Sequence, residues 1–204
     1  MLQDTLVQFN EKLSSKEAVP GGGGAASLCA ALAASLSSMV TELTIGKKRY
    51  REFEEENLAI REEAVSLRNL LLEGIEKDAE AFYPLSVAYG KDKNAPGYAE
   101  ELEECLWNAA EAPAELLRHV CRVIELDERL AETGSKLAIS DAASSASLAY
   151  GALYAAFINV KVNTRLMKNK ERASALEKEM RELRDEYAHR AMQVYERVEE
   201  RLNG

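Results

Sequence analysis

Hydrophobic and polar positions follow helical spacing along most of the chain. Leu2, Leu6, Phe9 and Leu13 recur every three or four residues and predict a first helix over residues 2–13. A longer charged stretch repeats apolar residues at every seventh position, which is the spacing of a helix packed in a bundle. Its two rows are Phe53, Ile60 and Leu67, and Leu58, Val65, Leu72 and Ala79. These rows predict a helix over residues 51–89.

Further helices are predicted over residues 25–45, 98–131, 136–168 and 170–202, because Ala, Leu, Glu, Lys and Arg dominate these stretches. The few glycines and prolines mark their limits. Gly46 closes the second helix, Pro84 kinks or ends the long one, Gly90–Gly97 forms a loop, and Pro113 interrupts the next helix. The predicted fold is therefore all-α: a single-domain helical bundle over residues 1–204, with a Gly-rich loop at the start of the second helix.

Two of these helices are made mostly of small residues, which lets neighbouring backbones approach closely. Each carries a stripe of such residues and is expected at the centre of the bundle, where the two would also lie across a homodimer axis. The stripes are Ala26, Ala30, Ala33 and Ser37, and Ala142, Ala146, Ala149 and Leu153. A membrane span is not expected, because the first apolar run is short and rich in serine and Asp141 precedes the second.

Composition and charge narrow the class of protein. Hydrophobic residues make up 47% of the 204 residues and charged residues 30%, as in an ordinary globular protein. The net charge of −9 argues against general binding of nucleic acid or of an anionic membrane, since both depend on Lys and Arg. An odd number of cysteines, Cys29, Cys105 and Cys121, predicts reduced thiols. With no basic leader at the N-terminus, a cytoplasmic location is expected.

The run Gly21, Gly22, Gly23 and Gly24 opens directly into a helix and is the sharpest local feature. Free backbone N–H groups and the positive end of the helix dipole meet there, so the run predicts an anion-binding loop. The alternative is a flexible helix start. A dinucleotide fingerprint does not apply because no strand precedes the glycines, and a Walker A loop does not because no Lys-Ser or Lys-Thr follows them.

Three charged residues are candidates for catalysis. Lys47 belongs to a cationic cluster after the second helix, where it could instead interact with the C-terminal dipole of that helix. Asp78 lies on an apolar side of the long helix, where burial would raise its pKa and suit it to acid–base work, unless it is simply solvated. Asp141 enters a helix of low polarity and could instead cap its N-terminus.

Asn159 and Asn163 are four residues apart on one helical face, so their amides could read the edge of a heterocycle or bond across the bundle. The two histidines, His119 and His189, have no Asp, Glu or Cys at ligand spacing, and no metal site is predicted. No nucleophile elbow and no Cys/His pairing is found, which leaves covalent catalysis without a candidate.

These motifs together resemble the family of formiminotetrahydrofolate cyclodeaminases and methenyltetrahydrofolate cyclohydrolases. The resemblance rests on five segments in order, over essentially the whole chain: 19–26, 46–50, 78–82, 140–142 and 159–163. The chain departs from many relatives in lacking a serine after the third glycine, and the transferase domain of the animal cyclodeaminase is absent from the sequence.

The resemblance implies a dimeric, all-helical folate enzyme without metal or cofactor. It suggests Asp141 and Asp78 for proton transfer at the one-carbon bridge, with Lys47 as their partner or as a clamp for the folate glutamate tail. Gly21–Gly24 would receive the folate, and Asn159 and Asn163 would orient it. Without a transferase domain to supply formimino-folate, hydrolysis of 5,10-methenyltetrahydrofolate is expected over cyclodeamination. A non-catalytic scaffold is the rival outside enzymes, although it has no need of four glycines.

Overall fold

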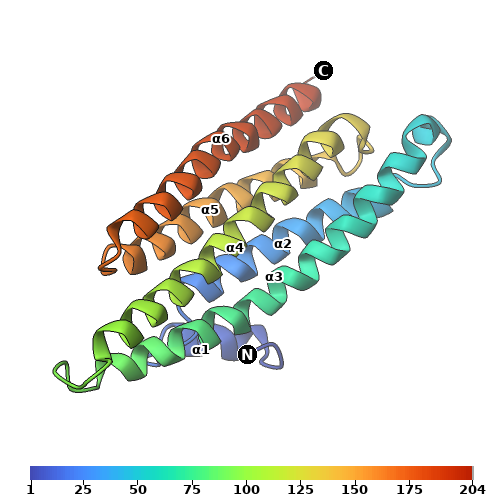
Figure 1. Cartoon of the computed structure of the whole chain (residues 1–204). Helices are drawn as coiled ribbons and strands as arrows, with labels where there is room; N and C mark the ends of the chain where they lie inside the picture. The colour runs from blue at the N-terminus through green and yellow to red at the C-terminus, as the bar shows by residue number, and fades with distance from the viewer. Residues whose placement is uncertain (204) are drawn as a thin grey trace.

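The computed structural model describes residues 1–203, which form an elongated bundle of α-helices (Figure 1) and contain no β-strand. This confirms the predicted all-α bundle. The elements are α1 (Leu6–Leu13), α2 (Gly22–Glu42), the 3-10 helix η1 (Lys48–Phe53), α3 (Glu54–Tyr89), α4 (Tyr98–Thr133), α5 (Ile139–Thr164) and α6 (Lys170–Asn203).

Most helix boundaries fall within a few residues of those predicted, and the differences have local causes. α1 begins at Leu6 because Thr5 caps it: the Thr5 hydroxyl accepts the N–H of Gln8, whose side chain accepts the N–H of Thr5. α2 ends at Glu42, and the chain turns at Gly46, whose φ of 79° favours glycine. The predicted loop at Gly90–Gly97 separates α3 from α4.

Neither Pro84 nor Pro113 ends the helix in which it lies. α3 continues through Pro84 to Tyr89, and α4 runs without a break through Pro113, so the predicted interruption of the fourth helix is wrong. A proline inside a helix removes one backbone donor and leaves the carbonyl four residues earlier without its partner. For Pro113 that carbonyl belongs to Ala109, and it accepts a side-chain donor from another helix, as described below.

The predicted small-residue stripes of α2 and α5 lie in the core of the bundle, whereas the opposite side of each helix remains open to solvent. Both stripes are almost completely inaccessible to solvent, with Ala30, Ala33, Ala142 and Leu153 at 0% exposure. α2 is long and apolar enough to cross a membrane by length and composition, but more than half of it is buried by the other helices, as in a core helix. The three cysteines are free thiols; Cys121 is buried, whereas Cys29 and Cys105 are half-buried.

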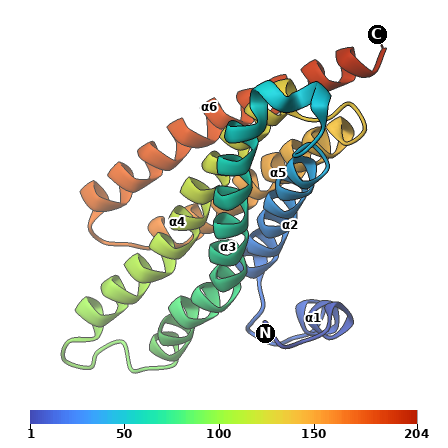
Figure 2. The same ribbon diagram turned by 90° about the vertical axis from the view of Figure 1, so that its right-hand side faces the viewer.

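The two predicted heptad rows of the long helix differ in how far their side chains are buried. Ile60 and Leu67 belong to the core, whereas Leu58 and Leu72 are only half-buried at the margin of the contact. Seen from the side, α3, α4 and α6 cover one side of the central helices, and α1 stands apart from the bundle beside α2 (Figure 2).

Asp127 of α4 is a charged residue type buried at the centre of the bundle. Its side chain is completely inaccessible, and its Oδ1 accepts the hydroxyl of Ser37 at 2.7 Å. The Ser37 and Ser145 hydroxyls lie 3.0 Å apart, so the three residues connect α2, α4 and α5. Within residues 1–203, the Asp127 Oδ2 has no hydrogen-bond partner. Burial raises the pKa of Asp127 to about 8, and the carboxyl is therefore protonated at neutral pH.

This raised pKa makes stability depend on pH. Between pH ~4 and ~8 the folded chain keeps a proton that the unfolded chain releases, so the free energy of unfolding should fall as pH rises, by at most about 1.4 kcal/mol per pH unit. Urea unfolding at pH 6 and pH 8 measures this loss. Asp127→Asn should reduce it, whereas Asp185→Asn, at an exposed carboxylate, should leave it as in the wild type. An equal loss in wild type and Asp127→Asn would contradict a protonated Asp127.

Candidate functional site

The glycine run forms the first turn of α2, and the carboxylate of Asp78 lies against it. Gly21 is the N-cap, so Gly22–Gly24 belong to the helix rather than to the predicted loop. Gly21 has no side chain to cap the helix, and the Asp78 Oδ2 instead accepts the N–H of Gly24 at 3.0 Å. A carboxylate at this position also interacts favourably with the helix dipole. The group that binds the glycine run in this structure is therefore the Asp78 carboxylate of α3, which belongs to the same chain.

Gly23 is the residue that makes this approach possible. A Cβ atom built on Gly23 would lie 2.0 Å from the Asp78 Oδ1, closer than real side chains come to one another. The requirement at Gly23 is therefore one of space. At Gly22 a Cβ would lie 3.1 Å from the Asn159 Nδ2, whereas at Gly21 it would meet nothing within 4 Å. The need for glycine is sharpest at Gly23.

Asp78, Asn159 and Asn163 line one cleft of about 160 Å³ between α2, α3 and α5. Gly21, Gly22 and Gly23 form its edge on α2. Apolar walls come from Ala18, Val19, Phe82, Ala109 and Val162. Six of the nine predicted site residues thus meet in one place, together with an aromatic ring.

Asn163 holds α5 to α4 where Pro113 weakens the backbone ladder. The Asn163 Nδ2 donates to the Ala109 carbonyl at 2.9 Å, the carbonyl that Pro113 leaves unpaired. The same nitrogen donates to the Asn159 carbonyl at 3.0 Å. The Asn159 Nδ2 donates to the carbonyl of Ala155 at 2.7 Å. Both amides are thereby held by the backbone, and each keeps an oxygen that can accept a hydrogen bond.

Burial raises the pKa of Asp78, and the hydrogen bond from Gly24 lowers it in part. The carboxyl is therefore more basic than an exposed aspartate. Beside an aromatic ring and two side-chain amides, such a group can accept a proton from a bound molecule or stabilise positive charge on it.

Lys47 and Asp141 do not lie in this cleft. Eighteen residues of α5 separate Asp141 from Asn159, which places them about 27 Å apart along the helix. Lys47 is at the same end as Asp141, where its Nζ donates to the Ser135 hydroxyl at 3.0 Å. The prediction of a single site holding Asp78, Lys47 and Asp141 is therefore wrong within one chain. Helical rise along the sequence already separates Asp141 from Asn159, but only the packing of α3 on α5 shows which of the two Asp78 joins.

Asp141 is half-buried in the first turn of α5, three residues after the N-cap position at Ala138. It is not the N-cap, and within residues 1–203 no hydrogen bond involves its carboxylate. Nearby, the Tyr50 hydroxyl accepts the N–H of Lys136 at 2.9 Å, which ties η1 to the segment before α5. These contacts bring the cationic cluster and Asp141 to one end of the bundle.

Sequence reasoning missed Phe82 as a site residue. It follows Asp78 by four residues, so both lie on one face of α3, and that spacing was the available signal. Among residues 1–203, no group of three or more His, Cys, Asp or Glu side chains is placed to hold a metal ion.

Comparison with known proteins identifies the family of the chain. The profile of the formiminotransferase-cyclodeaminase family matches residues 5–182. A methenyltetrahydrofolate cyclohydrolase from Methylorubrum extorquens is 38% identical over 98% of both chains. The rat formimidoyltransferase-cyclodeaminase is 27% identical over 82% of this chain, which spans 32% of that longer protein.

A solved structure shows the same fold. The formiminotetrahydrofolate cyclodeaminase from Thermotoga maritima superposes with a TM-score of 0.84 and 30% identity, covering 99% of this chain and 97% of the other. The match extends over the whole bundle, and the expected resemblance is confirmed. The chain belongs to the formiminotransferase-cyclodeaminase family.

Proposed function

We propose that this protein hydrolyses 5,10-methenyltetrahydrofolate to 10-formyltetrahydrofolate. The observation that carries the proposal is the basic, half-buried carboxyl of Asp78 in a cleft with two fixed amides and Phe82. The same activity is favoured by the 38% identity, over nearly the full length, to the methenyltetrahydrofolate cyclohydrolase of Methylorubrum extorquens.

The geometry suits the chemistry of a cationic folate. The methenyl carbon between N5 and N10 carries positive charge, which a carboxylate stabilises. Water adds to this carbon and one of its protons goes to Asp78. The C–N5 bond then breaks, the other proton ends on N5, and the oxygen remains in the formyl group. One proton is released overall, so the reaction needs a base whose pKa is close to the working pH.

The amides and the aromatic ring supply the remaining contacts. The oxygens of Asn159 and Asn163 can accept the N–H groups along a pterin edge, and Phe82 offers a face for its ring. The N–H groups of Gly22 and Gly23, at the positive end of α2, can donate to a carbonyl or an oxyanion. The proposal requires neither a metal nor a cofactor.

Formiminotetrahydrofolate cyclodeamination is the second candidate, favoured by the structural match to the Thermotoga protein. There N10 attacks the N5-formimino carbon, and ammonia leaves to give 5,10-methenyltetrahydrofolate. The same carboxyl would accept the N10 proton and return a proton to the leaving nitrogen.

Absorbance at the methenyl-folate band tests both reactions, with each folate supplied separately to protein dialysed against EDTA. Loss of the band from the methenyl compound supports hydrolysis, and its appearance from the formimino compound supports cyclodeamination. Activity with neither folate would contradict both and favour a scaffold.

We further propose a cytoplasmic homodimer that joins the faces of α2 and α5. Large apolar side chains are exposed along both helices: Leu32 and Met39 on α2, Leu43 directly after it, and Tyr154, Ile158 and Val162 on α5. No charged residue lies in α2 before Glu42 or in α5 between Asp141 and Lys161. An uncharged apolar face of this length is typical of a contact between subunits.

A dimer also accounts for the separated site residues. A two-fold axis perpendicular to the helices exchanges the two ends of this face. The end of one subunit that carries Asp78 and Asn159 would then lie against the partner subunit's Asp141 and the partner subunit's Lys47. Lys47 would be available there for the folate glutamate tail.

Light scattering tests the association. Wild type should give twice the monomer mass of 22.6 kDa at micromolar concentration. Ile158→Glu should give the monomer mass, because a charge buried at the centre of a contact is costly. Val87→Glu, at an exposed apolar residue of α3, should leave the dimer intact. A monomeric wild type would contradict the proposal.

A further inference from the structure

Asp78 borders a second hollow besides the cleft. A narrow slot of about 20 Å³ lies between α2, α3 and α4 and shares Asp78 and Gly23 with the cleft. Its other walls include Ser27, Gly74 and His119. The carboxyl therefore has one side toward the proposed folate and another toward this slot.

Two small residues shape the slot. A Cβ on Gly74 would lie 3.0 Å from the Ser27 hydroxyl oxygen, so glycine keeps the space beside that oxygen open. Ser27 is 1% exposed, and within the described part of the chain its hydroxyl makes no hydrogen bond. A volume of this size accommodates about one water molecule, which needs two or more polar partners. Asp78, Ser27 and His119 all line the slot, and their polar side chains can serve as such partners.

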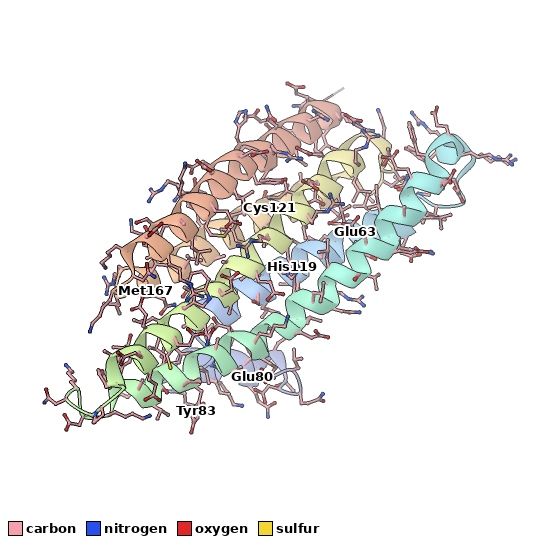
Figure 3. The ribbon with its side chains drawn as sticks, viewed as in Figure 1. Glu63, Glu80, Tyr83, His119, Cys121 and Met167 are labelled. Carbon is pink, nitrogen blue, oxygen red and sulfur yellow. The ribbon has the colours of Figure 1, made fainter. Side chains whose placement is uncertain are left out.

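The other end of the slot reaches the surface at His119. Figure 3 shows this residue on α4, on the side facing α3. Beside it Lys77 of α3 and Glu115 of α4 form an ion pair at 3.3 Å, with both side chains nearly half exposed. Burial lowers the pKa of His119, Glu115 raises it, and Lys77 and Arg118 lower it further. A neutral imidazole can accept a proton at one nitrogen and donate from the other.

We propose that this slot carries protons between Asp78 and solvent by way of Ser27, one water molecule and His119. The inference rests on the proposed function, in which Asp78 takes a proton from the attacking water. A bound folate covers the cleft side of Asp78, so a route on the other side lets the carboxyl release its proton while ligand is present. His119 touches neither folate nor the reacting atoms and acts through Asp78.

The proton balance is simple. Hydrolysis of the methenyl cation releases one proton for each molecule of water consumed. Asp78 passes that proton to the Ser27 hydroxyl, which gives its own proton to the water in the slot. This water passes one to His119, and His119 releases one to bulk solvent. Cyclodeamination consumes protons because ammonia leaves, and it would use the same path in the opposite direction.

The test is turnover in weak buffer. His119→Gln should lower kcat about tenfold, since proton transfer then limits the reaction, with KM unchanged. Added imidazole should restore kcat. His189→Gln, at the other histidine of the chain, exposed on α6, is the matched control and should equal wild type. A purely structural role would alter KM or give a loss that imidazole does not repair. Full kcat in His119→Gln, or no restoration, would overturn the proposal.

A second measurement does not depend on activity. With two histidines in the chain, NMR can follow the His119 ring, identified by its persistence in His189→Gln. Asp78→Asn should lower the midpoint of the His119 titration, because in the proposed path a water molecule couples the carboxylate to the imidazolium. Lys77, Glu115 and Arg118 are unchanged in this comparison. An unchanged midpoint would overturn the link. If wild type turns over neither folate, the proposed function fails, and this measurement alone decides on the slot.

Discussion

Asp78→Asn and Asp141→Asn should each lower turnover by roughly a hundredfold or more while folate still binds. Asparagine keeps the shape of the side chain, and its oxygen can still accept the N–H of Gly24, so α2 stays capped. The change removes the basicity and the negative charge that the cationic folate requires. Activity measured at saturating folate gives the turnover, and a separate binding titration gives the folate affinity.

Mixing the two inactive variants tests whether the site spans two subunits. After unfolding and refolding together, a mixed dimer contains one site with both aspartates and one with neither. An equal mixture should recover about a quarter of the wild-type activity, since half of the dimers are mixed and each has one intact site. No recovery would place both aspartates in one subunit's site or outside it. If dimeric Asp141→Asn keeps more than about half its turnover, Asp141 is not catalytic.

Gly23→Ala should also reduce kcat/KM by about a hundredfold or more, because its Cβ would lie 2.0 Å from the Asp78 Oδ1. The carboxyl must move out of contact with α2, which removes the hydrogen bond to Gly24 and displaces the base from the cleft. Gly23→Val, which adds a branched side chain, should act at least as strongly. Gly22→Val should weaken folate binding by displacing Asn159.

Gly90→Ala is the control for these changes. A Cβ at Gly90 would make an ordinary contact of 3.5 Å, outside the cleft and at the C-terminal end of α3. Its activity and unfolding midpoint should remain near those of wild type. Full activity in Gly23→Ala would show that the glycine run serves only to begin the helix.

Within the site, the sequence could predict residue types but not their partners. Asp78 was singled out by its place on an apolar face, and burial does raise its pKa. That it caps α2, and that Gly23 makes room for it, depends on α3 passing the start of α2, more than fifty residues away in sequence. For Asn163, the contact with Ala109 arises because α5 packs on α4 where Pro113 frees a carbonyl.

The sequence by itself determined the all-α bundle and its central helices, because helical periodicity and small-residue stripes are local patterns that tertiary packing only has to satisfy. It also indicated the family, through motifs spread along the chain. Tertiary structure alone decided which motifs meet. The helices run nearly the length of the bundle, so residues on one helix can lie about 27 Å apart, at opposite ends. Asp78 therefore joins Asn159, while Lys47 and Asp141 lie at the other end, because antiparallel packing sets the neighbours of each helix end.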